Sequence, residues 1–170
     1  MFSSEDPVAV QLGLIHELTT VLQEAQIPHW LFGGWVVDFL AGEITRPHHD
    51  IDLILWLRDA PAFRDLLAQH GYTEGPSPSG PELDARFCKH SQLVEVMFVH
   101  EREDGGTYWD HWRLPPGTLE ARHGRIGEIL CPIVSPKTLL DCKEACLLQE
   151  NEPSEQEKHT QDIARLRALL

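Results

Sequence analysis

Two aspartates, Asp50 and Asp52, stand two positions apart at the head of an apolar segment that reads Asp-Ile-Asp-Leu-Ile-Leu-Trp-Leu. Because the side chains of a β-strand alternate between its two faces, both carboxylates point to the same face of a predicted strand over residues 50–57. Carboxylate oxygens at this spacing are suited to hold one Mg²⁺ ion or two. The pair therefore predicts a sheet with a metal-binding face.

A pair of glycines precedes the aspartates. Gly33 and Gly34 follow a strand-like segment at 29–32 and precede a short helix that we expect to begin at Trp35. Glycine lets backbone N–H groups approach a phosphate closely, and the N-terminus of the next helix adds a positive dipole. An ordinary tight turn would explain the glycines if they stood alone, but the nearby aspartates favour a nucleotide site. We therefore expect Gly33, Gly34 and Trp35 to cradle a triphosphate.

These motifs resemble those of the nucleotidyltransferase superfamily of DNA polymerase beta, and within it the small enzymes that adenylylate aminoglycosides and lincosamides. The family pattern is Gly-Gly-Trp, then Asp, then Thr-Arg-x-His-x-Asp-x-Asp before apolar residues. The corresponding residues here are Gly33-Gly34-Trp35, Asp38 and Thr45-Arg46-Pro47-His48-His49-Asp50-Ile51-Asp52. The match continues without a gap, which makes it more specific than a lone Gly-Gly or a lone Asp-x-Asp.

The resemblance implies an α/β (α+β) nucleotidyltransferase fold with a mixed β-sheet backed by helices. It places a nucleotidyltransferase domain at residues 1–134 and a small C-terminal helical part at residues 135–170, packed on the domain. It also implies transfer of a nucleoside monophosphate, AMP from ATP, to a hydroxyl of a small-molecule acceptor such as an aminoglycoside or lincosamide. Mg²⁺ is the expected cofactor, ATP the expected co-substrate and pyrophosphate the second product.

A third carboxylate is expected on a neighbouring strand. In residues 91–99 Glu95 stands between apolar residues, and a charge in such surroundings needs a partner. Related enzymes most often carry aspartate at the aligned position, where it binds metal, acts as a base for the acceptor hydroxyl, or does both. We assign Asp50, Asp52 and Glu95 as catalytic and metal-binding residues. The choice between base and ligand for Glu95 stays open, as does the alternative that it faces solvent on an edge strand.

The loop before the aspartates offers further contacts to the nucleotide. Arg46 either pairs with Asp38 to brace the loop or contacts phosphate with its forked guanidinium. His48 matches the loop histidine of the family, and the resemblance assigns Arg46 and His48 to nucleotide binding. His48 and His49 beside two aspartates could instead form a zinc or iron site, because imidazole is a common metal ligand. The family motif favours the nucleotide site.

Lys143 lies on the apolar side of a helix predicted over residues 135–148. A lysine there needs an anion, and similar enzymes carry a lysine at this place in a Ser-Pro-x-x-Leu-Leu-x-x-Lys pattern. We assign Lys143 to triphosphate binding; the alternative is a stem that reaches along the surface to water. Lys158 and Asp162 echo the family's Lys-Asp-x-x-Asp-Ile motif. His159 replaces the usual aspartate, so this echo supports the fold rather than a site.

Aromatic and acidic residues gather in the segment that follows the Glu95 strand. Trp109 and Trp112 could stack on a sugar ring, and Asp110 could attract an amine of the acceptor. A cluster of charges is more often a solvated surface, and neighbouring aromatic residues more often pack against the protein. Acceptor recognition and simple packing therefore both remain open for this segment.

The overall charge narrows the choice of partners. The chain has 14 basic and 27 acidic residues and a formal net charge of −13. Such a surface does not suit a protein that follows a long nucleic-acid backbone, and it suits a cationic acceptor. Acidic surfaces also keep proteins in solution without any partner, so charge alone does not identify one. The sequence leaves the oligomeric state open.

The cysteines and the composition of the N-terminal residues indicate the cellular compartment in which we expect the protein. The four cysteines, at positions 88, 131, 142 and 146, lack a close Cys-x-x-Cys pairing and are expected to be buried thiols in a reducing environment. The first residues include neither a basic segment nor a long apolar run, so we expect no signal peptide and no membrane span. The cytoplasm, where ATP is available, is the expected location.

The remaining secondary structure follows from periodicity and from capping residues. Helix 6–26 is expected to begin at the Asp6 cap and Pro7, and helix 135–148 at the Ser135 cap and Pro136. The other expected elements are a helix at 60–70 ending before Gly71, a loop at 75–81, an edge strand at 85–90, a turn-rich segment at 105–117, one or two strands at 125–134 that close the sheet, a loop at 149–157 and a helix at 158–170.

Two rival functions use the same fold. A toxin–antitoxin nucleotidyltransferase would adenylylate a protein or a tRNA end, and the acidic charge disfavours tRNA but not a protein. A non-catalytic relative would bind a nucleotide without turnover, which the three intact carboxylates disfavour.

Overall fold

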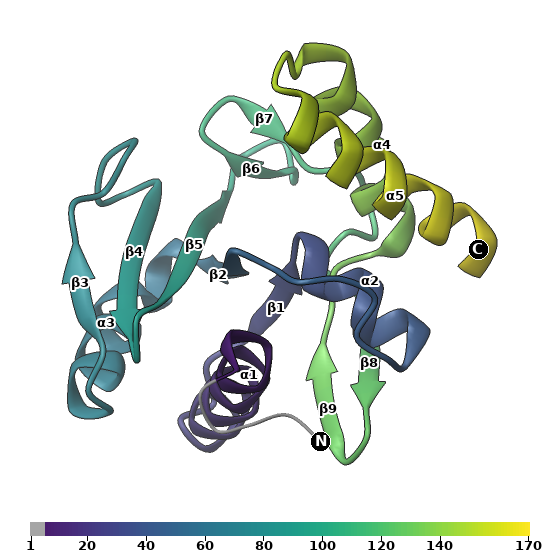
Figure 1. The fold of residues 1–170 in the computed structure, drawn as a ribbon. Coiled ribbons are helices and arrows are strands. Elements are labelled where there is room, and N and C mark those ends of the chain that lie inside the picture. The colour runs from purple at the N-terminus through teal and green to yellow at the C-terminus, as the bar shows by residue number, and fades with distance from the viewer. Residues whose placement is uncertain (1–5) are drawn as a thin grey trace.

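Figure 1 shows a computed structural model of the chain, which describes residues 6–170. Its helices are α1 (Pro7–Glu24), α2 (Gly34–Ala41), α3 (Ala60–Gln69), α4 (Pro136–Gln149) and α5 (Pro153–Leu169), with a short 3-10 turn, η1 (Leu57–Asp59). Its strands are β1 (His29–Phe32), β2 (Asp50–Trp56), β3 (Thr73–Gly75), β4 (Asp84–Lys89), β5 (Gln92–Glu101), β6 (Thr107–Trp109), β7 (Trp112–Arg113), β8 (His123–Ile126) and β9 (Ile129–Pro132).

The central sheet is mixed, as the family resemblance predicts. Its strand order is β1-β2-β5-β4-β3, and the small β6–β7 hairpin extends it from the end of β5. Strands β2 and β5 are parallel, whereas β1–β2, β4–β5 and β3–β4 are antiparallel. The segment that joins the two parallel strands contains η1, α3, β3 and β4. The parallel pair β2–β5 lies inside the sheet and carries Asp50, Asp52 and Glu95.

Helix α1 begins as its sequence predicts. The Asp6 carboxylate accepts a hydrogen bond from the backbone N–H of Val8 at 3.0 Å, and Pro7 occupies the first turn, where its missing N–H costs nothing. Leu14, Leu18 and other apolar residues of the same face are buried, and α1 packs against β2, β5 and β9. The helix therefore covers part of the sheet with its apolar face.

Alternation along β2 and β5 separates the core from the open face of the sheet. Ile51 pairs with Val94 and both are fully buried, whereas Asp52 pairs with Glu95 and both are partly exposed. Because paired residues of neighbouring strands share a face, one face of the parallel pair enters the hydrophobic core and the other carries carboxylates. This confirms the period-two pattern predicted for both strands.

Four elements differ from the prediction. Strand β4 is not an edge strand, because the short β3 pairs with its outer side. The turn-rich segment at 105–117 contains the β6–β7 hairpin. Strands β8 and β9 form a separate hairpin instead of closing the sheet, although Ile133 makes a parallel bridge to Leu31 of β1. Helix α5 begins at Pro153, so the predicted loop at 149–157 is reduced to residues 150–152 and the rest of its acidic stretch lies in the start of α5.

The last two helices lie side by side above α2 in Figure 1. Ser135 caps α4, as predicted, with its hydroxyl accepting from the backbone N–H of Thr138 at 3.5 Å. Helix α5 packs against both α4 and α2. The proposed division of the chain at residue 134 stays a prediction. Within residues 6–170, no helix combines the length and apolar character that a bilayer crossing requires.

Candidate active site

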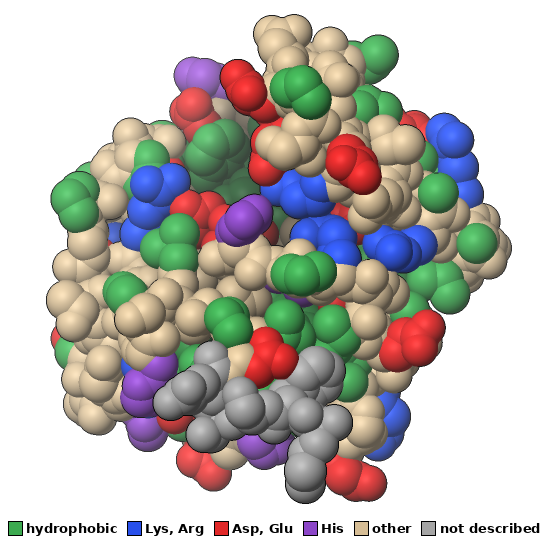
Figure 2. All heavy atoms as spheres, viewed as in Figure 1, with side chains coloured by type: hydrophobic (Ala, Val, Ile, Leu, Met, Phe, Trp, Pro, Cys, Tyr) green, Lys and Arg blue, Asp and Glu red, His purple; other side chains and the backbone are tan. Residues whose placement is uncertain are grey.

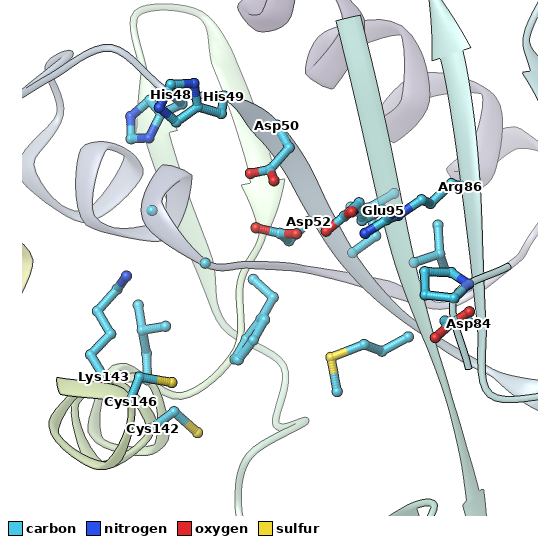
Figure 3. A pocket seen from close by; sticks show the side chains of 18 of the residues that line it. His48, His49, Asp50, Asp52, Asp84, Arg86, Glu95, Cys142, Lys143 and Cys146 are labelled. Atoms are coloured by element: carbon cyan, nitrogen blue, oxygen red, sulfur yellow. Dashed lines mark ion pairs between the residues drawn. The ribbon is translucent and has the colours of Figure 1, made fainter. Parts of the chain in front are cut away.

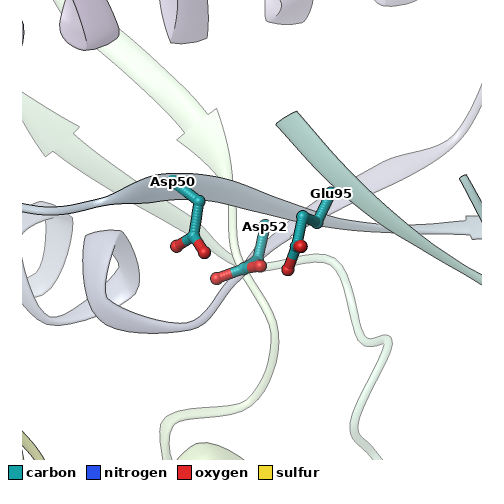
Figure 4. Close-up of side chains that lie close together, drawn as sticks. All are labelled: Asp50, Asp52 and Glu95. Carbon is teal, nitrogen blue, oxygen red and sulfur yellow. The ribbon is translucent and has the colours of Figure 1, made fainter. Parts of the chain in front are cut away.

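Three carboxylates converge on the open face of the sheet. Asp50 and Asp52 come from β2 and Glu95 from β5, and the parallel register places Asp52 directly beside Glu95. One carboxylate oxygen from each residue lies within 4.8 Å of the other two, and Figure 4 shows the three side chains directed to one point. Hard oxygen ligands from two rigid strands suit a divalent cation such as Mg²⁺. These side chains would hold it.

The electrostatics of the cluster also favour a cation. Burial raises the pKa of Asp52 well above its usual range, and the neighbouring charges of Asp50 and Glu95 raise it further. Lys143 and Lys158 act in the opposite direction but do not reverse the shift. Three close carboxylates therefore hold more negative charge than the surrounding protein compensates, and a divalent ion would relieve this repulsion.

Glu95 has a partner that the sequence did not reveal. Arg86 of β4 lies opposite Glu95 in the antiparallel register, and its Nε is 2.7 Å from Glu95 Oε1. Glu95 therefore does not face solvent alone on an edge strand, because β5 lies between β2 and β4. A strand prediction that fixed the β4–β5 register would have found Arg86.

The glycine pair lies directly against the carboxylates. Gly33 has φ of +71°, and a Cβ atom at this position would collide with the Asp52 carboxylate. A Cβ atom at Gly34 would collide with the guanidinium of Arg46 and lie 2.7 Å from His48 Nδ1. Both positions therefore require glycine because of close packing, and Gly33 also requires it because of its backbone conformation.

Trp35 does not join the glycines at the cavity. Its side chain is 1% exposed, its indole N–H donates to Gln11 Oε1 at 3.0 Å, and its ring lies 4.5 Å from the His48 ring. The Trp35 side chain therefore does not line the cavity, and the expected role of the Gly33-Gly34-Trp35 turn in holding a triphosphate stays a prediction. The tryptophan instead supports the turn and the loop histidine from the core side.

The loop that carries Arg46 and His48 is braced by other partners than expected. Arg46 makes a forked ion pair with Asp162 of α5, at 2.9 Å from Nε and 2.7 Å from Nη2, so the alternative in which it pairs with Asp38 is wrong. Asp38 is fully buried and instead accepts from Thr45 Oγ1 and pairs with His48 Nε2 at 2.6 Å. His48 is committed to this contact and lies outside the carboxylate cluster. The placement argues against the zinc or iron alternative.

Asp162 ties together two cations of the cavity. Besides Arg46 it binds Lys143 of α4, whose Nζ lies 2.8 Å from Asp162 Oδ2. Burial alone would raise the pKa of Asp162, but the hydrogen bonds and charges of Arg46 and Lys143 lower it below its usual value. Lys143 is 6% exposed, so its stem does not reach along the surface to water. The echo at Asp162 therefore marks a structural ion pair beside the site.

These residues surround a cavity of about 430 Å³. Carboxylates of β2 and β5 line one side, and Lys143, Lys158 and His159 of the last two helices line the other. Figure 2 shows acidic and basic side chains close together around a hollow on this face. Figure 3 shows Lys143 across the cavity from the aspartates. The cavity thus has carboxylates on one wall and basic side chains on the facing wall, where Lys143 pairs with Asp162 and Lys158 pairs with Glu155.

The third side of the cavity comes from β4 and its neighbours. Asp84 is fixed by hydrogen bonds from Ser77 Oγ and from the Ser79 backbone, which lower its pKa although burial opposes them. Trp109 also lines the cavity and donates its indole N–H to the Leu83 carbonyl at 2.8 Å. Trp112 and Asp110, which we grouped with Trp109, are not part of the lining. Only Trp109 of the predicted aromatic-acidic patch therefore lines the cavity. Asp84 also lines it, although no sequence motif pointed to this residue.

The cysteines are all free, but most are not buried. Cys131 is buried, Cys142 is half-buried, and Cys88 and Cys146 are exposed, which corrects the expectation of four buried thiols. Cys142 and Cys146 line the cavity beside Lys143.

A mixed sheet that presents three carboxylates beside a glycine turn, with a cationic wall opposite, defines a protein of the nucleotidyltransferase superfamily. The sequence profile described as Aminoglycoside-2''-adenylyltransferase matches residues 14–161. The chain therefore belongs to this family, which confirms the resemblance seen in the motifs.

Individual relatives support this membership locally. A 2''-aminoglycoside nucleotidyltransferase from Klebsiella pneumoniae is 44% identical over 43 residues, which are 25% of this chain and 24% of the relative. A protein of the same name from Escherichia coli matches with the same identity and coverage. The matched segment thus spans about a quarter of the length of the curated relatives.

Solved structures confirm the fold over nearly the whole chain. The crystal structure of ANT(2")-Ia in complex with adenylyl-2"-tobramycin has a TM-score of 0.75, with 18% identity and coverage of 94% of each chain. The lincomycin-bound structure of the lincosamide antibiotic adenylyltransferase LnuA has a TM-score of 0.64 and 18% identity, and covers 89% of this chain and 92% of its own. At this level of identity the similarity shows the nucleotidyltransferase fold.

Proposed function

We propose that the protein transfers AMP from ATP to a hydroxyl of a small-molecule acceptor, an aminoglycoside or a lincosamide, and releases pyrophosphate. The observation that carries the proposal is the convergence of Asp50, Asp52 and Glu95 beside the Gly33-Gly34 turn. Family membership and the ligands named for the structural relatives support the reaction and the acceptor class.

The proposed reaction is an in-line displacement at the α-phosphorus. The acceptor oxygen forms a bond to phosphorus, the bond to the pyrophosphate oxygen breaks, and the hydroxyl proton passes to a base. Mg²⁺ held by the three carboxylates would neutralise the triphosphate and lower the pKa of the attacking hydroxyl. Glu95 is the candidate base, and its carboxylate pairs with Arg86 before substrates bind.

Residues around the metal position would orient the nucleotide. The Gly33-Gly34 turn allows close approach of the triphosphate, and Lys143 and Lys158 supply positive charge on the opposite wall. Arg46 and His48 act mainly by fixing the loop, because both are engaged by buried aspartates. The fixed Asp84 carboxylate and the net charge of −13 favour a cationic acceptor. ATP as co-substrate implies a cytoplasmic location.

The proposal is tested by measuring pyrophosphate release with MgATP against a panel of aminoglycosides, lincosamides and other hydroxyl compounds. Asp52→Asn should abolish release. Because the Asp52 charge is unfavourable without metal, the variant should remain folded and be as stable as the wild-type protein, or more so. Asp65→Asn, at an exposed aspartate of α3, is the matched control and should leave turnover unchanged.

Two outcomes would count against the proposal. Turnover retained by Asp52→Asn would remove the aspartate from the reaction. Labelled AMP that appears on a co-expressed protein, and on no small molecule, would favour the toxin–antitoxin alternative.

A further inference from the structure

The wall opposite the carboxylates carries two thiols that the proposed reaction does not use. Cys142 and Cys146 lie on α4, one helical turn apart, and both line the cavity beside Lys143. Figure 3 shows their sulfur atoms on the cavity side of the helix. Cys146 is exposed and Cys142 is half-buried, so an entering reagent meets Cys146 first.

The spacing of the two cysteines limits what they can form. Side chains four residues apart on a helix have Cβ atoms about 5–6 Å apart, whereas a disulfide needs about 3.5–4.5 Å. A direct disulfide would therefore require part of α4 to unwind. A single atom that bonds to both sulfurs replaces one S–S bond by two bonds and so spans a longer distance. It can bridge the two cysteines without unwinding α4.

We propose that Cys142 and Cys146 form a chelating site for trivalent organic arsenicals inside the cavity. In the reaction, R–As(OH)₂ forms two As–S bonds and both As–O bonds break. The two thiol protons leave with the two oxygens as water, and arsenic stays trivalent, so no oxidant or reductant is needed. The bound R–As group would lie next to Lys143, where the proposed function places phosphate.

The surroundings favour stepwise binding. Burial raises the pKa of the Cys142 thiol to about 11, with a smaller contribution from the nearby Cys146. The exposed Cys146 would form the first As–S bond, and Cys142 would close the ring as an intramolecular step. An arsenical held by two sulfurs resists exchange with monothiols, because a broken As–S bond re-forms within the protein before the second As–S bond can break.

Intact-protein mass spectrometry with phenylarsine oxide tests the site directly. The wild-type protein should bind one phenylarsenic group and lose two thiol hydrogens. The adduct should persist in excess monothiol and be removed by 2,3-dimercaptopropanol. Cys142→Ser and Cys146→Ser should each lose the monothiol-resistant adduct. Cys88→Ser, at an exposed cysteine of β4 outside the cavity lining, is the matched control and should keep it.

A separate experiment measures inhibition of pyrophosphate release by the arsenical, and this experiment rests on the proposed function. The adduct should reduce pyrophosphate release at least tenfold, and saturating MgATP should slow its formation. A monothiol-resistant adduct in Cys142→Ser or Cys146→Ser, or none in the wild-type protein, would overturn the chelating site. Full turnover by the modified wild-type protein would overturn its position in the phosphate region. A protein that forms the adduct but turns over no triphosphate would contradict the proposed function and leave the arsenical site standing.

Discussion

Gly33 combines two constraints at one position. Its φ of +71° belongs to a region that residues with side chains rarely adopt, and a Cβ atom there would collide with Asp52. The glycine turn and the Asp52 carboxylate are therefore in direct contact, with no room between them for a methyl group. A change at Gly33 should affect stability and catalysis together.

Gly33→Ala should destabilise the protein by roughly 1–3 kcal/mol through backbone strain and overpacking. It should also abolish pyrophosphate release, because the Asp52 carboxylate must move. Chemical denaturation and the turnover assay measure the two effects. Gly13→Ala is the control, since a Cβ atom at this exposed position of α1 meets nothing within 4 Å. It should be neutral or stabilising by up to about 1 kcal/mol. Unchanged turnover in Gly33→Ala would contradict the close contact.

Under the proposed function, Arg86 would compete with Mg²⁺ for the Glu95 carboxylate. Its guanidinium is 2.7 Å from the Glu95 carboxylate, so Arg86→Gln should remove a competing positive charge and tighten Mg²⁺ binding several-fold. Isothermal titration calorimetry measures the affinity. Arg64→Gln removes an arginine that pairs with Glu74 at 2.9 Å, outside the cavity lining, and should leave it unchanged. Weaker Mg²⁺ binding in Arg86→Gln would show that Arg86 positions Glu95 for the metal.

At the residue scale, sequence predicted the contacts that depend on local periodicity. Asp50, Asp52 and Glu95 were placed on one face by the alternation of two strands, and the structure brings them together. The partner of Arg46 could not be predicted, because Asp162 is 116 residues away and the choice between it and Asp38 depends on how α5 packs. Cross-strand and helix-packing partners require the tertiary structure.

Helix α5 contributes to the site through a single buried carboxylate. Asp162→Asn should destabilise the protein by roughly 3–5 kcal/mol, because it leaves the buried Lys143 and the partly buried Arg46 without their counter-ion. Thermal and chemical denaturation measure the loss. Asp141→Asn is the matched control on α4: its pair with Lys137 is exposed and should be worth less than about 0.5 kcal/mol. Equal effects of the two variants would contradict a stabilising role for the buried pair.

The same carboxylate predicts a dependence on pH. Its pKa is lowered in the folded protein, so its contribution to stability is complete above the ordinary value of 3.8 and is lost as the pH falls through the folded pKa. The difference in unfolding free energy between the wild-type protein and Asp162→Asn should therefore narrow below pH 3.8. Urea titrations at a series of pH values measure this difference. If the difference in unfolding free energy stayed constant down to the pH of acid unfolding, the lowered pKa of Asp162 would not contribute to stability.

At the element scale, long periodic segments were predicted well and short strands were not. The helices α1 to α4 begin within about one residue of their predicted starts, because Asp6, Ser135 and the nearby prolines mark helix starts. The strands β3, β6 and β7 are too short to show periodicity and exist because they pair with longer neighbours. The start of α5 at Pro153 was missed because its acidic first turns resemble a solvated loop.

The charge of the whole molecule predicts how salt acts on the two substrates. With a net charge of −13, the protein would attract the proposed cationic acceptor by a long-range electrostatic force that dissolved salt screens. The KM for an aminoglycoside should therefore rise with ionic strength more steeply than the KM for MgATP. Steady-state kinetics at low and high salt measure both. A neutral hydroxyl acceptor serves as the control, and an equal rise for all three substrates would contradict electrostatic attraction.

The contact of Asp162 with Arg46 and Lys143 also predicts when the cavity becomes complete during synthesis. The strands that carry Asp50, Asp52 and Glu95 are translated before Asp162. Asp162 is the residue that binds both Arg46 of the loop and Lys143 of α4. A nascent chain arrested before Asp162 leaves the exit tunnel would expose carboxylates without the opposing wall. Such a chain should not retain a fluorescent ATP analogue, so the capacity to bind nucleotide would arise only after Asp162 has left the tunnel.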